Sequence, residues 1–369
     1  MKKISMCLVL CLLCFAFSVP TKAVSTSAQS AVLINADTGR VIYSQNMNER
    51  LPMASTTKIM TALLLAEENT PEKQIVTTRE MVTVEGSSMG LLAGDTVTYN
   101  DLLYGLMLAS GNDAANTTAI SISGSLEGFA DKMNAKAQDF GLTDTHFVTP
   151  SGLDHSDHYS TAYDMAVLTA YALKNEQFAA AAASESARLY YGNPPYYRTL
   201  TNHNKLLKMY DGAVGVKTGF TKRSGRCLVS AAKRGNVTLI AVTLNDKNDW
   251  NDHMALFDYG FANSTDCTLT PEIPSNITLA EGGSLLITVE PLQLGLSLDD
   301  KLEYKVHMPQ FLYSGVSAGE IVGYAQVLCG EKTVATLDIT AAEGATETAK
   351  QTNIYNQIIS EFLNLIRSF

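Results

Sequence analysis

A serine and a lysine three positions apart form the first group of residues that could do chemistry. Ser55 and Lys58 enclose two threonines, and helix-forming residues continue to position 67. Positions i and i+3 share one face of a helix, so this spacing brings the Lys58 amine towards the Ser55 hydroxyl. The positive end of the helix dipole would favour the alkoxide that forms there. The pattern therefore predicts a serine nucleophile with a lysine as its base.

A lysine acts as a base only when its amine is uncharged. Burial or a nearby cation must therefore lower its pKa from the usual value of about 10. Lys217 is the cation that we expect near Lys58. A serine three positions before a lysine is also typical of an exposed surface pair, so the prediction depends on two further motifs.

The second motif is Ser110-Gly111-Asn112, which follows the apolar stretch 102–109. Ser110 offers a hydroxyl that could relay a proton, and Asn112 offers an amide that could hold a peptide carbonyl. The same letters are typical of a turn that ends a helix, because Gly and Asn commonly stop helices.

The third motif is Lys217-Thr218-Gly219, which directly follows the strand-like residues 214–216. A glycine here would let a substrate backbone approach the strand edge closely. A bound peptide would add as a further strand, with Lys217 and Thr218 near its charged or polar end. Taken singly, this pattern also fits a strand that leads into a turn.

The three motifs in this order resemble those of penicillin-binding proteins and class A β-lactamases. Within that superfamily the chain is similar to the low-molecular-mass D-alanyl-D-alanine carboxypeptidases, the peptidase S11 family. The resemblance covers most of residues 29–262, in the stretches AVLINADTGRVIYSQN, LPMASTTKIMTALL, LMLASGNDAA and GVKTGFTKRSGRCLVSAA. It implies release of the terminal D-alanine from peptidoglycan stem peptides, covalent inhibition by β-lactams and no cofactor.

The resemblance also implies a role for each matching residue in acyl transfer. Ser55 would be the acylated nucleophile, Lys58 its base and Ser110 a proton relay to the departing D-alanine. The backbone N–H groups of Ser55 and Phe220 would form the oxyanion hole, and water would then hydrolyse the acyl-enzyme.

The remaining motif residues would bind the substrate. Asn112 would hold the substrate amide, and Lys217 and Thr218, followed by Gly219, would lie near its terminal carboxylate. Members of the family often add an arginine after the third motif to assist carboxylate recognition. The candidates for that position are Arg223, Arg226 and Lys247.

The cluster Asp154-His155-Ser156-Asp157-His158 offers two carboxylates and two imidazoles, which are possible metal ligands. No zinc-like helical His pair supports it elsewhere in the sequence. The stretch also resembles the family's loop before the helix that opens at Ser160-Thr161. We therefore expect a solvated loop and no metal.

The elements that must position these motifs follow from local patterns. The segment 31–43 predicts two strands joined by the turn Asp37-Thr38-Gly39. Helices are expected at 55–67, 100–109, 126–139, 161–174 and 250–261, with Thr161 as an N-cap, and strands from position 213 onwards. The predicted fold class is α/β (α+β), an antiparallel sheet with helices, and the family resemblance implies the serine β-lactamase or penicillin-binding-protein-like transpeptidase type.

The composition changes beyond Thr268, where prolines, glycine turns and alternating apolar residues predict a small all-β domain. We expect a catalytic domain at 24–265, a small β-sandwich at 266–345 and an amphipathic helix at 346–369. The apolar side of that helix predicts a membrane anchor, and packing on the β domain or on a second copy is the alternative.

The first 23 residues have the pattern of an export signal: Lys2 and Lys3, an apolar run from Ile4 to Val19, and a small-residue cleavage site at 21–23. An uncleaved anchor is the alternative. Cleavage would remove three of the 27 basic residues and none of the 37 acidic ones, which leaves a formal charge of −13. The acidic charge makes nucleic acid an unexpected partner. The export signal and the C-terminal helix together predict a peripheral position on the outer face of the cytoplasmic membrane.

Three alternative functions would use the same fold. A class A β-lactamase needs a glutamate for deacylation, usually in a loop between the second and third motifs and followed by an asparagine. The glutamates between Ser110 and Lys217 are Glu127, Glu176 and Glu185, and none is followed by asparagine. An endopeptidase on cross-linked peptides would attack the same D-alanyl carbonyl. A non-catalytic wall-binding protein would not need Ser55, Lys58 and Lys217.

Overall fold

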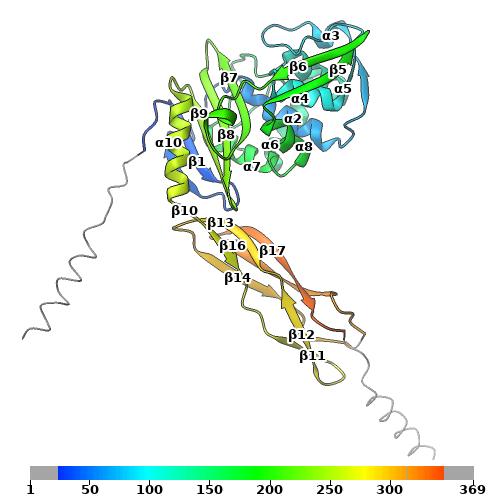
Figure 1. Cartoon of the computed structure of the whole chain (residues 1–369), viewed down its shortest axis with the longest axis vertical. Helices are drawn as coiled ribbons and strands as arrows, with labels where there is room; N and C mark the ends of the chain where they lie inside the picture. Colours follow the sequence, from blue (N-terminus) through cyan, green and yellow to red (C-terminus); the bar gives the residue numbers. More distant parts are fainter. Residues whose placement is uncertain (1–23, 314, 345–369) are drawn as a thin grey trace, which may run out of the picture.

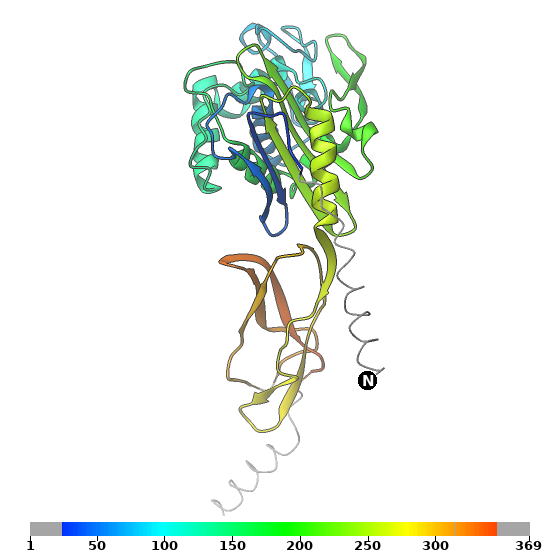
Figure 2. The same cartoon turned by 90° about the vertical axis from the view of Figure 1, so that its left-hand side faces the viewer.

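The computed structural model describes residues 24–313 and 315–344. Its central element is a five-stranded antiparallel sheet in the order β2-β1-β9-β8-β7. The strands are β1 (Ser30–Asn35), β2 (Val41–Gln45), β7 (Ala213–Thr221), β8 (Gly225–Arg234) and β9 (Val237–Leu244). In β1, Val32 and Ile34 pack with the helical region, whereas Leu33 packs with the face covered by α10 (Asp249–Ala262). The pleat therefore gives the sheet two covered faces (Figures 1 and 2).

The helices opposite α10 surround α2 (Lys58–Glu67), which is buried from Lys58 to Ala66. α2, α7 (Ala162–Ala172) and α8 (Glu176–Ala183) contact the sheet. Thr161 caps α7 as predicted, since its hydroxyl accepts the N–H of Asp164 at 3.0 Å. The remaining helical elements are η1 (Ala54–Thr57), α3 (Arg79–Val82), α4 (Tyr99–Met107), α5 (Asn112–Ser123), α6 (Leu126–Asp139) and α9 (Leu206–Met209).

A second sheet lies beside the helices, in the order β3-β4-β5-β6. Its strands are β3 (Gln74–Val76), β4 (Thr96–Thr98), β5 (Ser186–Gly192) and β6 (Pro195–Thr201). The sequence patterns predicted helices and no strands between positions 55 and 212, so these four strands were missed. β3 and β4 are only three residues long, too short for a period-2 pattern to appear in the sequence.

The C-terminal β region (residues 264–313 and 315–344) continues below the large sheet in Figures 1 and 2. β10 (Ser264–Leu269) pairs with β13 (Leu292–Ser297), and the other strands form a six-stranded sheet in the order β14-β16-β17-β12-β11-β15. Those strands are β11 (Asn276–Leu279), β12 (Ser284–Val289), β14 (Leu302–His307), β15 (Phe311–Leu312), β16 (Ile321–Cys329) and β17 (Lys332–Ala341). β12 alternates exposed and buried residues along its whole length, which places Leu285, Ile287 and Val289 in a small core.

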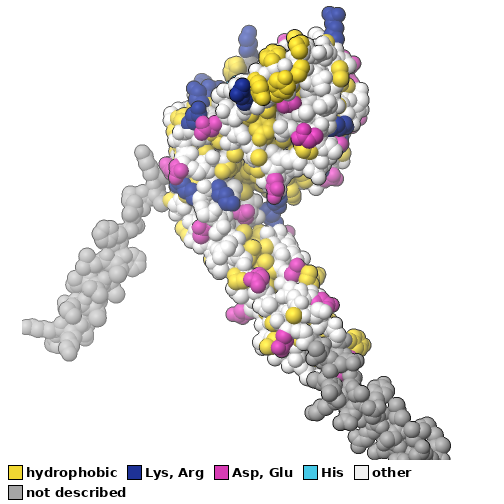
Figure 3. All heavy atoms as spheres, turned by 45° about the vertical axis from the view of Figure 1, so that its right-hand side comes forward, with side chains coloured by type: hydrophobic (Ala, Val, Ile, Leu, Met, Phe, Trp, Pro, Cys, Tyr) yellow, Lys and Arg dark blue, Asp and Glu magenta, His cyan; other side chains and the backbone are white. Residues whose placement is uncertain are grey.

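The predicted fold class, an antiparallel sheet with helices and a small all-β C-terminal region, is confirmed. Acidic side chains are scattered over both parts on the face shown in Figure 3, in keeping with the net charge of −10. The export signal at 1–23 and the helix at 346–369 lie outside the described residues. Within the described residues, no helix is long and apolar enough to cross a membrane.

Candidate active site

Ser55 lies in η1, a tight turn at the start of α2 rather than the first turn of an α-helix. The residue before it, Ala54, has a φ of 47°, in the left-handed region that a residue with a side chain rarely adopts. The Thr57 hydroxyl donates to the Ala54 carbonyl at 2.8 Å and so fixes this conformation. Gly152 packs against the same carbonyl, because a Cβ at that position would lie 1.9 Å from the Ala54 oxygen. The turn is therefore held from two sides with Ser55 at its apex.

Lys58 is fully buried next to Ser55. Its Nζ lies 2.9 Å from the Ser55 Oγ, 2.7 Å from the Asn112 Oδ1 and 2.6 Å from the Ser151 carbonyl oxygen. Burial, followed by the charge of Lys217, holds the pKa of the Lys58 amine well below its usual value. A neutral amine has two N–H groups and one lone pair. Since the Asn112 and Ser151 oxygens can only accept, they take both N–H groups, and the lone pair is left facing the Ser55 hydroxyl.

Ser110 and Asn112 reach the site from the turn between α4 and α5, and Asn112 contacts Lys58. Ser110 has a φ of 56°, and its side chain lines the cleft in front of Ser55. Asn112 begins α5, and its Nδ2 donates to the Glu85 carbonyl at 2.6 Å while its Oδ1 accepts from Lys58. One N–H and one lone pair of the Asn112 amide remain for a further partner.

Lys217 and Gly219 belong to β7, which packs against η1. Lys217 is buried, and burial lowers the pKa of its amine to about 7. Gly219 allows the close approach of β7 to the nucleophile turn, because a Cβ there would lie 3.0 Å from the Ser55 nitrogen. The space that we assigned to a substrate backbone at Gly219 is therefore occupied in part by the protein's own turn.

A cleft of about 490 Å³ lies where the three motifs meet. Its lining includes five residues predicted for the site, namely Ser55, Ser110, Thr218, Gly219 and Phe220. The other three, Lys58, Asn112 and Lys217, are buried. Sequence reasoning missed several lining residues, namely Ser87, His203, Cys227, Asp249 and Trp250. Burial and the charge of Lys217 lower the pKa of His203.

Arg226 is the one of the three candidate carboxylate-binding residues that lines this cleft. Its Nε and Nη2 donate to the two carboxylate oxygens of Asp249 at 3.0 and 2.6 Å. The guanidinium also lies over the Trp250 ring, 5.6 Å from its centroid. Arg223 instead donates to the His155 carbonyl, and Lys247 is exposed outside the lining.

The expectation of a solvated loop at 154–158 was wrong for His158. Asp154, His155, Ser156 and Asp157 are exposed, but His158 is buried behind the nucleophile turn. Its Nδ1 accepts the Val148 N–H at 2.9 Å, and its Nε2 lies 2.8 Å from the Thr57 Oγ1. Burial lowers the pKa of this imidazole to about 3, so it is neutral at physiological pH. Within residues 24–313 and 315–344, no group of three or more His, Cys, Asp or Glu side chains could hold a metal ion.

The sequence of the chain is similar to those of several known proteins. A family model described as D-alanyl-D-alanine carboxypeptidase, Peptidase_S11, matches residues 17–248. D-alanyl-D-alanine carboxypeptidase DacF of Bacillus subtilis is 42% identical over 60% of this chain, and the match spans 58% of that relative's length. DacC of Escherichia coli is 32% identical over 84% of this chain and 82% of its own length.

Two solved structures show how far the likeness in fold extends. The Streptomyces K15 DD-transpeptidase superposes with a TM-score of 0.63 at 32% identity, covering 66% of this chain and all of the other. Penicillin-binding protein 5 of Haemophilus influenzae, at 23% identity and a TM-score of 0.66, covers 89% of this chain and all of its own. The fold likeness therefore reaches into the C-terminal β region.

Proposed function

Because this chain belongs to the peptidase S11 family of D-alanyl-D-alanine carboxypeptidases, we propose that it releases the terminal D-alanine from peptidoglycan pentapeptides through an acyl-enzyme on Ser55. The observation that carries the proposal is the environment of Lys58. A buried amine lies 2.9 Å from the Ser55 hydroxyl, and two carbonyl oxygens occupy its other positions. This is the arrangement that a neutral general base requires.

Acylation then proceeds in two steps. The Ser55 Oγ attacks the carbonyl carbon of the penultimate D-alanine while Lys58 takes the hydroxyl proton. The oxyanion is stabilised by the N–H groups of Ser55 and Phe220. Ser110 relays the proton from the Lys58 ammonium to the amine of the departing D-alanine, and the C–N bond breaks as the Ser55 ester forms. A water molecule then hydrolyses the ester and regenerates Ser55.

The free carboxylate of the substrate would bind at the end of the cleft formed by Lys217, Thr218 and Arg226. Asp249 holds the Arg226 guanidinium through Nε and Nη2, which leaves Nη1 for a carboxylate oxygen. Asn112 would use its remaining N–H for the substrate amide. Gly219 permits the contact between β7 and Ser55 that brings these groups together.

Labelling with a fluorescent penicillin tests the nucleophile. The wild-type protein should acquire one covalent label and Ser55→Ala none, because the label is an ester of that hydroxyl. D-alanine released from a pentapeptide separates an enzyme from a binding protein, and a cross-linked dimer tests endopeptidase action. A label that persists in Ser55→Ala would refute the assignment.

The Arg226 assignment has its own experiment. Arg226→Ala should raise the KM for a pentapeptide on the order of 10-fold or more, because the charge-assisted contact of Nη1 with the substrate carboxylate is lost. Arg223→Ala is the matched control, since that arginine contacts only the His155 carbonyl nearby. Equal KM changes in the two variants would exclude a specific role for Arg226.

For the parts of the chain outside the described residues, we propose a cleaved export signal at 1–23 and a peripheral membrane helix at 346–369. The catalytic domain would span 24–265 and the small β domain 266–345. Deletion of 346–369 should abolish co-sedimentation with phosphatidylglycerol vesicles and leave D-alanine release from a soluble peptide unchanged. Retained vesicle binding would place the membrane contact elsewhere.

A further inference from the structure

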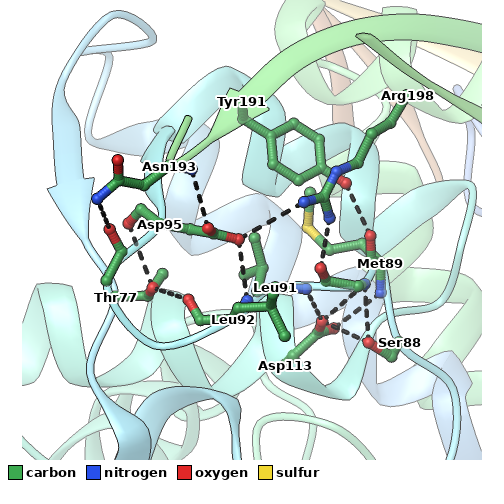
Figure 4. A network of polar contacts seen from close by, with 12 residues as sticks. Thr77, Ser88, Met89, Leu91, Leu92, Asp95, Asp113, Tyr191, Asn193 and Arg198 are labelled. Atoms are coloured by element: carbon green, nitrogen blue, oxygen red, sulfur yellow. Dashed lines mark hydrogen bonds and ion pairs between the residues drawn. The ribbon is translucent and has the colours of Figure 1, made fainter. Parts of the chain in front are cut away.

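A single carboxylate holds the loop beside the cleft. Asp113, in the first turn of α5, is 1% exposed. Its oxygens accept hydrogen bonds from the Ser88 hydroxyl at 2.6 Å and from the backbone N–H groups of Met89, Gly90 and Leu91 at 2.9 to 3.0 Å. All four donors lie in residues 85–92, which we call the cleft loop. Figure 4 shows them converging on Asp113.

The cleft loop is also held from the β5–β6 hairpin. The Tyr191 hydroxyl donates to the Met89 carbonyl at 2.7 Å, and the Arg198 guanidinium donates to the Gly90 carbonyl. Arg198 in turn lies 3.6 Å from the Asp95 carboxylate. As Figure 4 shows, the Asp113 carboxylate accepts hydrogen bonds from backbone N–H groups of the cleft loop. Tyr191 and Arg198 of the hairpin donate to two backbone carbonyls of the same loop.

The cleft loop is joined to the catalytic motifs through the residue before Asp113. The Asn112 N–H donates to the Ser87 carbonyl at 2.7 Å, and its side chain donates to the Glu85 carbonyl. Ser87 itself lines the cleft together with Ser55 and Ser110. The loop therefore supplies part of the cleft wall, and its position depends on α5.

Gly111 explains why the loop can come this close. A Cβ at that position would lie 2.6 Å from an Asp113 oxygen and 3.0 Å from the Met89 nitrogen. The second motif thus has two consequences in the fold: Ser110 and Asn112 face the nucleophile, and Gly111 leaves room for the loop to reach Asp113.

We propose that Asp113 is a positioning residue for the peptide substrate, which it affects by fixing the cleft loop as a preformed wall of the cleft. The inference rests on the proposed peptidase function. Without the carboxylate, three backbone N–H groups of the loop lose their acceptor, and the loop would have to be ordered when the peptide binds. That cost belongs to binding, so it should appear in KM more than in kcat.

Asp113→Asn tests this, because the amide keeps the size of the side chain but replaces one acceptor oxygen with a donor. Titration with fluorescent penicillin gives the fraction of intact sites, and the constants are then expressed per titrated site. We expect the pentapeptide KM to rise on the order of 10-fold, with kcat changed much less. A purely structural role would lower the titre and the melting temperature, and it would leave both constants per site unchanged.

Asp101→Asn is the matched control. Asp101 is also a buried aspartate in a helix first turn. Its carboxylate accepts from the Thr98 N–H and hydroxyl and, within the described residues, makes no hydrogen bond to the cleft loop. Its KM should equal that of the wild type. An equal KM in Asp113→Asn, or an equal rise in both variants, would overturn the proposal.

If Asp113→Asn does not fold, Ser88→Ala is the second variant that tests the proposal. Ser88 is exposed, and its hydroxyl is one of the four donors to Asp113. Ser88→Ala should raise KM in the same direction by a smaller factor and speed hydrogen exchange in residues 85–92. Unchanged KM and exchange would contradict the inference. Failure of the proposed function would look different, because the wild-type protein itself would then release no D-alanine.

Discussion

The two buried lysines of the site need opposite charge states. Lys58 must be neutral to accept the Ser55 proton, and Lys217 must be charged to attract a carboxylate. The pKa of Lys58 is held well below its usual value by burial and by Lys217, and that of Lys217 is lowered to about 7 by burial. The positive charge of Lys217 disfavours a second charge on Lys58, so a neutral Lys58 beside a charged Lys217 is the state that the mechanism uses.

The need for a neutral Lys58 and a charged Lys217 predicts a bell-shaped pH dependence of kcat/KM, which reports the free enzyme. The rate should rise on the acid side as Lys58 loses its proton and fall on the alkaline side around pH 7 as Lys217 loses its own. Lys217→Arg should shift the alkaline limb to much higher pH, because a guanidinium stays charged. An alkaline limb with the same midpoint in that variant would assign it to another group.

Lys217 should also lower the free energy of unfolding. Its folded pKa of about 7 lies below the unfolded value of about 10.4, so the unfolded chain binds more protons between these two pH values. Stability from this group is therefore lowest below pH 7 and rises as the pH increases. At pH 6 we expect Lys217→Met to have a higher melting temperature than the wild type, and a free energy of unfolding that is larger by up to a few kcal/mol. This difference in stability should shrink towards pH 10. Catalytic activity should be lost. A variant that is less stable than the wild type at pH 6 would contradict this assignment.

At the scale of elements, the nucleophile turn depends on the segment that precedes the 154–158 loop. Gly152 has a φ of 86°, and a Cβ there would lie 1.9 Å from the Ala54 carbonyl oxygen. Gly152→Ala should therefore displace the turn, lower the free energy of unfolding by about 1–3 kcal/mol and slow acylation by penicillin. Stopped-flow labelling and thermal melts measure the two effects.

Gly141→Ala is the control for backbone strain alone. Gly141 also has a positive φ, of 70°, but a Cβ there would meet nothing within 4 Å. It should lose some stability and keep the acylation rate of the wild type. A similar slowing of acylation in both variants would show that the Ala54 contact has no special effect on Ser55.

The elements predicted from sequence are those whose signal is local. The hairpin at 31–43, the helix of Ile59 to Leu64 and the cap at Thr161 each depend on residues a few positions apart, and each was confirmed. β3 and β4 are held by pairing with distant strands, so their short sequences carried little information. The burial of His158 likewise depends on packing against Thr57, which lies 101 residues earlier in the chain.

The site shows the same division. The three motifs could be predicted to meet because their order and letters match a known pattern. His203, Trp250 and Asp249 reach the cleft through the packing of α10 and the β6–α9 connection against the sheet, which no local pattern records. Asp113 was hidden for a different reason: a carboxylate in a helix first turn is ordinary, and only its four loop donors distinguish it.

At the scale of the whole molecule, the C-terminal β region meets the large sheet at the end remote from the cleft. Arg226, at the start of β8, lines the cleft, whereas the turn after β8 contacts the C-terminal β region. The ten residues of β8 span about 30 Å. The contacts include a hydrogen bond from the Asn35 Nδ2 to the Gly295 carbonyl at 2.9 Å and an ion pair between Arg40 and Asp300 at 3.8 Å.

Gly295 is the tightest point of this junction. A Cβ there would lie 2.4 Å from the Val237 Cα and 2.6 Å from the Asn236 carbonyl oxygen, and neither backbone atom can move aside without shifting β9. Gly295→Ala should therefore loosen the junction, because moving the C-terminal β region breaks the Asn35 hydrogen bond and costs less than distorting the central sheet. Small-angle X-ray scattering should show a larger radius of gyration.

Gly295→Ala should not affect catalysis. Since the cleft lies about 30 Å from the junction, kcat/KM for a soluble pentapeptide should stay within about twofold of the wild type. Gly330→Ala is the control, because Gly330 lies in the same region with open space around its Cβ position, and it should leave the radius of gyration unchanged. A large loss of activity in Gly295→Ala would mean that the C-terminal β region acts on the cleft through β8 and β9, and so is more than a spacer.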